Sequence, residues 1–143
     1  MNIFLDTSSL VKLYHRENET EELLQLVGGG KVDGIYLSTL SSVEYYSAIW
    51  KKVRIKEFTE KAGMEAIKMF EANFNNYNWI DDSDLLKAIA INMVSRYGKS
   101  HSIKTLDAIQ LATAITLKPS VSLFKTSDKV LQQLFEAEGL PTK

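Results

Sequence analysis

The chain has 143 residues, 45% of them hydrophobic and 24% charged, which is ordinary for a single globular domain covering residues 1–143. It has no cysteine, which excludes a disulfide framework and a thiolate zinc site, and its net charge of −1 does not by itself favour a nucleic-acid partner. No apolar run is long enough for a signal peptide or a membrane span, so we expect a cytoplasmic protein that does not bind membranes.

The first part of the chain predicts short strands that alternate with helices. Buried strands are expected where short apolar runs end in turn or capping residues, and helices where apolar residues recur every three or four positions. In chain order these are a strand at Ile3–Leu5, a helix capped by the sequence Asp-Thr-Ser-Ser and reaching Tyr14, a helix at Glu19–Val27, a strand at Ile35–Leu37 and a helix from Thr39 to Val53.

The second part continues the alternation. Its predicted elements are a helix with an apolar stripe from Phe58 to Tyr77, a strand at Asn78–Asp81, a helix capped by Asp82 or Ser83 and ending near Gly98, a helix at Thr105–Leu117, a strand at Val121–Phe124 and a helix at Ser127–Glu138. This order predicts an α/β fold with a central, mainly parallel sheet and helices on both faces. Ligands of such sheets bind beyond the C-terminal ends of the strands.

Four acidic residues lie in surroundings that are unusual for a solvated charge. Asp6 lies in NIFLDTSSLVKLY, Glu44 in LSTLSSVEYYSAIW, Asp107 in KTLDAIQLATAI and Asp128 in VSLFKTSDKVLQQL. An ionised carboxylate in apolar surroundings is costly unless its charge is offset, and one divalent cation can offset several. Magnesium prefers such oxygen ligands, and it activates water for attack at phosphorus. The pattern therefore predicts a metal-dependent nuclease.

Each of these acids also has a purely structural interpretation. Asp6 and Asp128 can be no more than N-caps of the helices that follow them. Asp107 falls in the first turn of its helix, where the helix dipole favours an anion, with Thr105 as a candidate cap. Glu44 can be a half-exposed helix charge.

The four segments resemble the PIN-domain ribonucleases and, within them, the VapC-type toxins of toxin–antitoxin pairs. FLDTSSLVKLY is similar to the family's first strand and helix, SSVEYYSAI to the segment with the second acid, and FKTSDKVLQQL to the last motif; the best match is LDAIQLATAI. The resemblance implies that four residues are both catalytic acids and metal ligands, namely Asp6, Glu44, Asp107 and Asp128.

The same resemblance implies a fold, an activity and partners. The fold is a PIN-like three-layer α/β/α domain. The activity is that of a hydrolase, a Mg²⁺- or Mn²⁺-dependent endoribonuclease that uses a metal-activated water, with the hydroxyls of Thr7 and Thr126 supporting the acids. The partners are RNA, a small cognate antitoxin and a second copy of the chain in a homodimer. One departure is the short end LPTK, which leaves little room for the edge strand that often closes the family's sheet.

Two rival functions stay open. A metal-dependent phosphatase of the haloacid dehalogenase type also begins with a strand followed by Asp, but it requires a second Asp two residues later, where this chain has Ser8. A non-catalytic PIN-like module that binds RNA or protein usually lacks one or more of the acids, whereas this chain retains them all. The nuclease is therefore the preferred interpretation.

Overall fold

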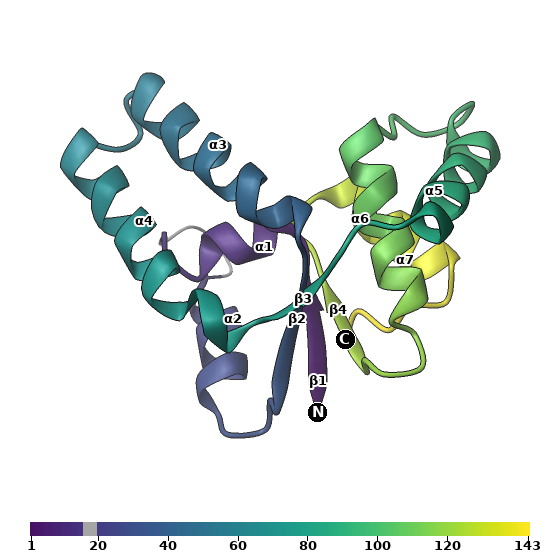
Figure 1. Ribbon diagram of the computed structural model, residues 1–143, viewed down its shortest axis with the longest axis horizontal. Coiled ribbons are helices and arrows are strands. Elements are labelled where there is room, and N and C mark those ends of the chain that lie inside the picture. The colour runs from purple at the N-terminus through teal and green to yellow at the C-terminus, as the bar shows by residue number, and fades with distance from the viewer. Residues whose placement is uncertain (16–19) are drawn as a thin grey trace.

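A parallel β-sheet between two layers of helices forms the centre of the molecule (Figure 1). The computed structural model describes residues 1–15 and 20–143, and within them the sheet has four strands in the order β3-β2-β1-β4. The strands are β1 (Asn2–Leu5), β2 (Gly34–Ser38), β3 (Asn78–Ile80) and β4 (Leu123–Lys125). Every neighbouring pair is parallel, which confirms the predicted fold class.

The helices follow the predicted order, and their bounds differ mainly at the ends. They are α1 (Thr7–Lys12), α2 (Thr20–Gly28), α3 (Leu40–Arg54), α4 (Glu60–Asn73), α5 (Asp84–Tyr97), α6 (Thr105–Thr116) and α7 (Lys129–Ala137), with a 3-10 turn η1 (Phe74–Asn76) after α4. The predicted start of the second helix at Glu19 lies outside the described residues. No helix in the described part of the chain is both long and apolar enough to cross a membrane.

Two helix boundaries have local causes. The long helix begins later than its apolar stripe because Thr59 caps it, accepting a hydrogen bond from the backbone N–H of Ala62 at 3.1 Å. Of the two candidate caps for α5, Ser83 is the one used, and it accepts from the N–H of Leu86 at 3.1 Å.

The side chains of β1 alternate between the two helical layers, as a pleated strand requires. Ile3 and Leu5 pack in a core with α1, α2, α3 and α4, whereas Phe4 packs on the other face with α5, α6 and α7. Figure 1 shows the first group of helices on one side of the sheet and the second group on the other. The predicted three-layer α/β/α arrangement is therefore confirmed.

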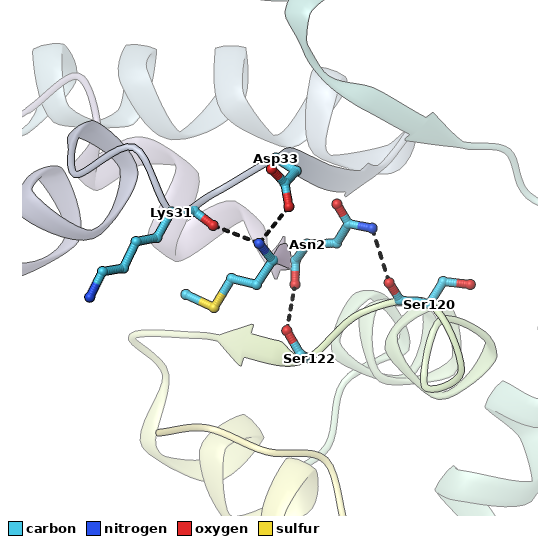
Figure 2. A network of polar contacts seen from close by, with 6 residues as sticks. Asn2, Lys31, Asp33, Ser120 and Ser122 are labelled. Carbon is cyan, nitrogen blue, oxygen red and sulfur yellow. Dashed lines mark hydrogen bonds and ion pairs between the residues drawn. The ribbon is translucent and has the colours of Figure 1, made fainter.

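Polar contacts fix the N-terminal end of the central strand β1 (Figure 2). The amino group of Met1 donates to the carbonyl of Lys31 and to Asp33 Oδ2, each at 2.6 Å. On the other side, Asn2 Nδ2 donates to the carbonyl of Ser120 at 3.2 Å. These contacts tie β1 to the segments that lead into β2 and β4.

The outer edge of β4 is covered by the end of the chain without a further strand. The N–H of Phe124 donates to the carbonyl of Pro141 at 2.8 Å, and Lys125 Nζ donates to the carbonyl of Thr142 at 3.3 Å. Pro141 has no N–H, so a ladder of hydrogen bonds cannot continue through it. Within the described residues no fifth strand forms there, as the length of LPTK suggested.

The helix that carries Glu44, α3, packs closely against α4 at a glycine. A Cβ atom placed on Gly63 would lie 2.7 Å from Val53 Cγ2 and 3.5 Å from Ile49 Cγ2. The approach of the two helices therefore depends on the missing side chain.

We expect Gly63→Ala to lower the free energy of unfolding by about 1 kcal/mol, because overpacking costs about 1–3 kcal/mol and a helical Ala regains about 1 kcal/mol over Gly. Urea unfolding followed by circular dichroism measures the change. Gly28→Ala is the matched control, since a Cβ there meets nothing within 4 Å, and it should be neutral or stabilising. Equal stability of the two variants would show that α3 and α4 adjust without penalty.

Candidate active site

The predicted acids gather at the C-terminal edge of the sheet. Asp6 directly follows β1 and Asp128 follows β4, and these strands are parallel neighbours in which Leu5 pairs with Lys125. Glu44 lies near the start of α3, which follows β2. Asp107 lies in the first turn of α6, where the charge of Asp128 acts on it, as it also does on Asp6.

Asp6 is nearly inaccessible, with 4% of its surface exposed, and its carboxylate is held from both sides. Oδ1 accepts from the N–H of Ser9 at 2.9 Å, so Asp6 does cap α1. Ser8 Oγ lies 2.8 Å from the same oxygen, and Thr126 Oγ1 donates to Oδ2 at 2.5 Å. The capping interpretation is correct, but it does not explain why hydroxyls from two elements converge on one carboxylate.

The buried position changes the acidity of the site. Burial raises the pKa of Asp6 from 3.8 to about 6, against the lowering effect of the hydrogen bonds from Thr126, Ser9 and Ser8; the charge of Asp128 raises it further. The pKa of Asp107 is also raised, chiefly by burial. The hydrogen bonds around Asp6 and Asp107 therefore offset only part of the cost of placing negative charge in this buried region.

Asp128 and Asp107 each have one carboxylate oxygen bound to the backbone. Asp128 Oδ1 accepts from the N–H of Leu131 at 2.8 Å as the N-cap of α7. Asp107 Oδ2 accepts from the N–H of Lys104 at 3.2 Å. The prediction that Thr105 caps α6 is wrong. Lys104 occupies the cap position, its ammonium cannot accept a hydrogen bond, and Asp107 instead accepts from its backbone N–H.

The side chain of Glu44, on α3, is contacted by side chains of two other helices, α1 and α6. Thr7 Oγ1 of α1 donates to Glu44 Oε1 at 2.8 Å and lies 2.9 Å from Ser41 Oγ of α3. Gln110 Nε2 of α6 donates to the same Glu44 oxygen at 3.0 Å. Thr7 and Thr126 thus each contact a predicted acid, and their place in a catalytic site stays a prediction.

The oxygen donors suit a hard divalent cation. Among the described residues, Asp107 Oδ1, Asp128 Oδ2 and Glu44 Oε2 accept no hydrogen bond, so each carboxylate has an oxygen left for another partner. Magnesium is usually held by one or two carboxylates, with water and substrate oxygens completing its octahedron. Within residues 1–15 and 20–143 no three Asp, Glu, His or Cys side chains lie close enough to hold one ion together. The donor set therefore fits a cation bound by few carboxylates, not a closed protein cage.

Two polar residues of this region were not predicted as parts of the site. Ser8 Oγ contacts Asp6 and also accepts from the N–H of Ser127 at 2.9 Å, which joins α1 to the loop after β4. Gln110 is 3% exposed. The signal for Gln110 was present in the sequence, because it is an amide within an otherwise apolar helical run.

Comparison with known proteins identifies the family. The sequence matches the PIN domain over residues 3–135, so the chain belongs to the PIN domain family. No curated protein matches it.

Solved structures have the same fold at low sequence identity. VapC20 from Mycobacterium tuberculosis, a sarcin-ricin loop cleaving toxin, is 15% identical, with a TM-score of 0.65 over 92% of this chain and 93% of that chain. FitAcB from Neisseria gonorrhoeae is 17% identical, with a TM-score of 0.68 over 98% and 95%. A toxin–antitoxin complex from Klebsiella pneumoniae is 19% identical, with a TM-score of 0.62 over 90% and 88%. The similarity establishes the fold of the chain.

The raised pKa of Asp6 predicts how the stability of the metal-free protein changes with pH. Between 3.8 and about 6 the folded state retains a proton on Asp6 that the unfolded state has lost, so the free energy of unfolding falls as pH rises through this window. The effect is at most about 3 kcal/mol, from about 1.4 kcal/mol for each unit of pKa shift.

We expect Asp6→Asn to remove this pH dependence and to be more stable than the wild type at neutral pH in EDTA. Urea unfolding of both proteins across the acidic and neutral range measures the difference. If Asp6→Asn is less stable than the wild type throughout, the hydrogen bonds to the carboxylate outweigh the penalty of burying its charge.

Proposed function

We propose that the chain is a divalent-metal-dependent endoribonuclease and the toxin of a type II toxin–antitoxin pair. The observation that carries the proposal is the gathering of acidic side chains from separate elements at the C-terminal edge of a parallel sheet, one of them almost fully buried. Membership of the PIN domain family supports the same function. The proposed catalytic acids and metal ligands are Asp6, Glu44, Asp107 and Asp128. They would be divided between one or two cations and substrate-bridged contacts, because no three of these described side chains lie close enough to hold one ion together.

The protein's own contribution is to orient these carboxylates, and the hydrogen bonds to Asp6 oppose the rise in its pKa that burial causes. Thr126 and Ser8 donate to Asp6, and Thr7 donates to Glu44. Unaided, the acids would repel a phosphodiester, so a cation has to reverse the local field before RNA binds. When bound, Mg²⁺ or Mn²⁺ would polarise the phosphate and activate water for attack at phosphorus.

A groove beside Asp128 supports the proposal that the substrate is a polyanion. It has a volume of about 1120 Å³ and is lined by parts of α1, α2, β4 and α7. Among the described residues that line it, the acidic ones are Glu22 and Asp128 and the basic ones are Lys12, Lys31, Lys125, Lys129 and Lys143. Since the whole chain has a net charge of −1, the described lining of the groove carries a local excess of positive charge, and such an excess attracts nucleic acid. We infer that the RNA strand reaches the acids along this groove.

The proposed protein partner is a small antitoxin. The similarity in fold to a chain of the toxin–antitoxin complex from Klebsiella pneumoniae supports it. On α3 and α4, Val43, Trp50, Met64 and Met69 are exposed, and Val43 exposes 68% of its surface. Exposed apolar side chains of this kind are suited to burial against another protein. The homodimer and the cytoplasmic location stay predictions.

RNA cleavage by the purified chain, freed of any antitoxin, should require Mg²⁺ or Mn²⁺ and should stop in EDTA. Asp128→Ala should lower the cleavage rate by more than about 100-fold, beyond the 10–100-fold typical of residues that only orient a ligand. Asp33→Ala, at the opposite end of the sheet, is the matched control and should cleave like the wild type. A gel assay on a structured RNA measures all three.

The other outcomes of that assay separate the alternatives. Cleavage that continues at the same rate in EDTA would contradict a metal-dependent mechanism. Hydrolysis of small phosphomonoesters without RNA cleavage would favour the phosphatase, and RNA binding without cleavage would favour the non-catalytic module.

The groove predicts a change in salt dependence. Replacing both Lys31 and Lys129 by Ala should weaken RNA binding and flatten its dependence on salt, by a slope of about 0.7 for each phosphate of a single strand that the lysines no longer neutralise. Fluorescence anisotropy with a cleavage-resistant RNA measures both quantities. Replacing Lys61 and Lys68 of α4 removes the same charge outside the groove, and an equal effect of the two double variants would contradict the proposed path.

A further inference from the structure

Gln110 is a buried amide whose position packing alone does not explain. Its Nε2 lies 2.9 Å from Ser41 Oγ, 3.0 Å from Glu44 Oε1 and 3.2 Å from Thr7 Oγ1. Its Oε1, in contrast, is the one buried side-chain nitrogen or oxygen atom in the described part of the chain without a hydrogen-bond partner. The amide is therefore satisfied at one end only, and that end faces Glu44.

Charge fixes which end of the amide faces Glu44. If the oxygen and nitrogen of the Gln110 amide were exchanged, its carbonyl oxygen would lie against Glu44 Oε1, and two acceptors would face each other. Glu44 Oε1 would also lose one of its two donors. The unmatched carbonyl is thus the consequence of directing the N–H groups at the carboxylate.

An unmatched carbonyl in the interior lowers stability, because the group loses its hydrogen bonds to water without replacement. The neighbours of Gln110 on α6 include the buried Ala108, Leu111, Ala112 and Ala114. An apolar side chain of similar length would avoid the unmatched carbonyl, but it would take one hydrogen-bond donor away from Glu44 Oε1 and from Ser41 Oγ. A hydrogen bond to an ionised carboxylate is stronger than one between neutral groups, and here it is the interaction that only the amide provides.

We propose that Gln110 is a positioning residue that holds Glu44 in its metal-binding orientation and leaves its own carbonyl unmatched; this rests on the proposed function. Donors from α1 and α6 converge on Glu44 Oε1, while Oε2 accepts no hydrogen bond from the described residues. Fixing one oxygen from two directions restricts the flexible Glu44 side chain and leaves the other oxygen for the cation. Residues that orient a ligand in this way commonly change metal affinity by 10–100-fold.

The test is to replace Gln110 by methionine, which has a similar length and no amide. Mn²⁺ binding to the metal-free protein, measured by calorimetry, should weaken by on the order of 10-fold. The melting temperature in EDTA should change little, because removal of the unmatched carbonyl offsets the loss of the hydrogen bond to the Glu44 carboxylate. Thr113→Val is the matched control: Thr113 is buried in the same helix, but its Oγ1 donates only to the carbonyl of Ile109, at 2.8 Å, so Mn²⁺ affinity should not change.

A double-mutant cycle shows whether Gln110 acts through Glu44. In a Glu44→Gln background, Gln110→Met should have almost no further effect on Mn²⁺ affinity, because the ligand it positions is already lost. If Gln110→Met is too unstable to purify, Thr7→Val removes the other donor to the same oxygen and should weaken Mn²⁺ binding in the same way. If Gln110→Met weakens Mn²⁺ binding as much in the Glu44→Gln background as in the wild type, the inference is overturned.

The outcomes distinguish this inference from the proposed function. Wild-type affinity for Mn²⁺ in Gln110→Met, with metal-dependent RNA cleavage intact in the wild type, would overturn the positioning role alone. A wild-type protein that binds no Mn²⁺ and cleaves no RNA would overturn the proposed function and this inference with it.

Discussion

The burial of the Asp6 carboxylate between the ends of β1 and β4 is the constraint around which the site is arranged. A charge with 4% exposure has to be compensated by nearby donors, and these come from Ser8 and Ser9 on one side and from Thr126 on the other. Those donors reach Asp6 because β1 and β4 are parallel neighbours although they lie at opposite ends of the chain. The sheet order therefore creates the site, and the rest of the fold holds that order in place.

The same contacts serve the fold and the proposed chemistry. Asp6 and Asp128 cap helices, and Asp107 accepts from the N–H of Lys104, the residue just before its own helix. A cap uses one carboxylate oxygen, so Asp128 and Asp107 each retain a second oxygen for a cation. Structural and functional interpretations of these residues are therefore compatible. The raised pKa of Asp6 shows that, in the metal-free protein, the hydrogen bonds to its carboxylate do not fully offset the cost of burying its charge.

Much of the architecture was predictable because it is encoded locally. The spacing of apolar residues gave the strands and helices, and their alternation gave the parallel sheet, since such connections return each strand to the same direction. The position of Asp6 and Asp128 beyond strand ends then followed from the sheet. The error at α6 was also local. A lysine is not a residue from which a helix cap is predicted, and here Asp107 accepts from the N–H of that lysine.

The sequence by itself determined the fold class, the approximate bounds of its elements and the position of Asp6 and Asp128 just beyond two strand ends. Only the tertiary structure decided which side chains surround them. Thr7, Glu44 and Gln110 belong to three helices far apart in the chain, and Lys31 and Lys129 share a groove although almost a hundred residues separate them. Such neighbours are set by how helices pack across the sheet, and neither periodicity nor a motif within one segment contains that information.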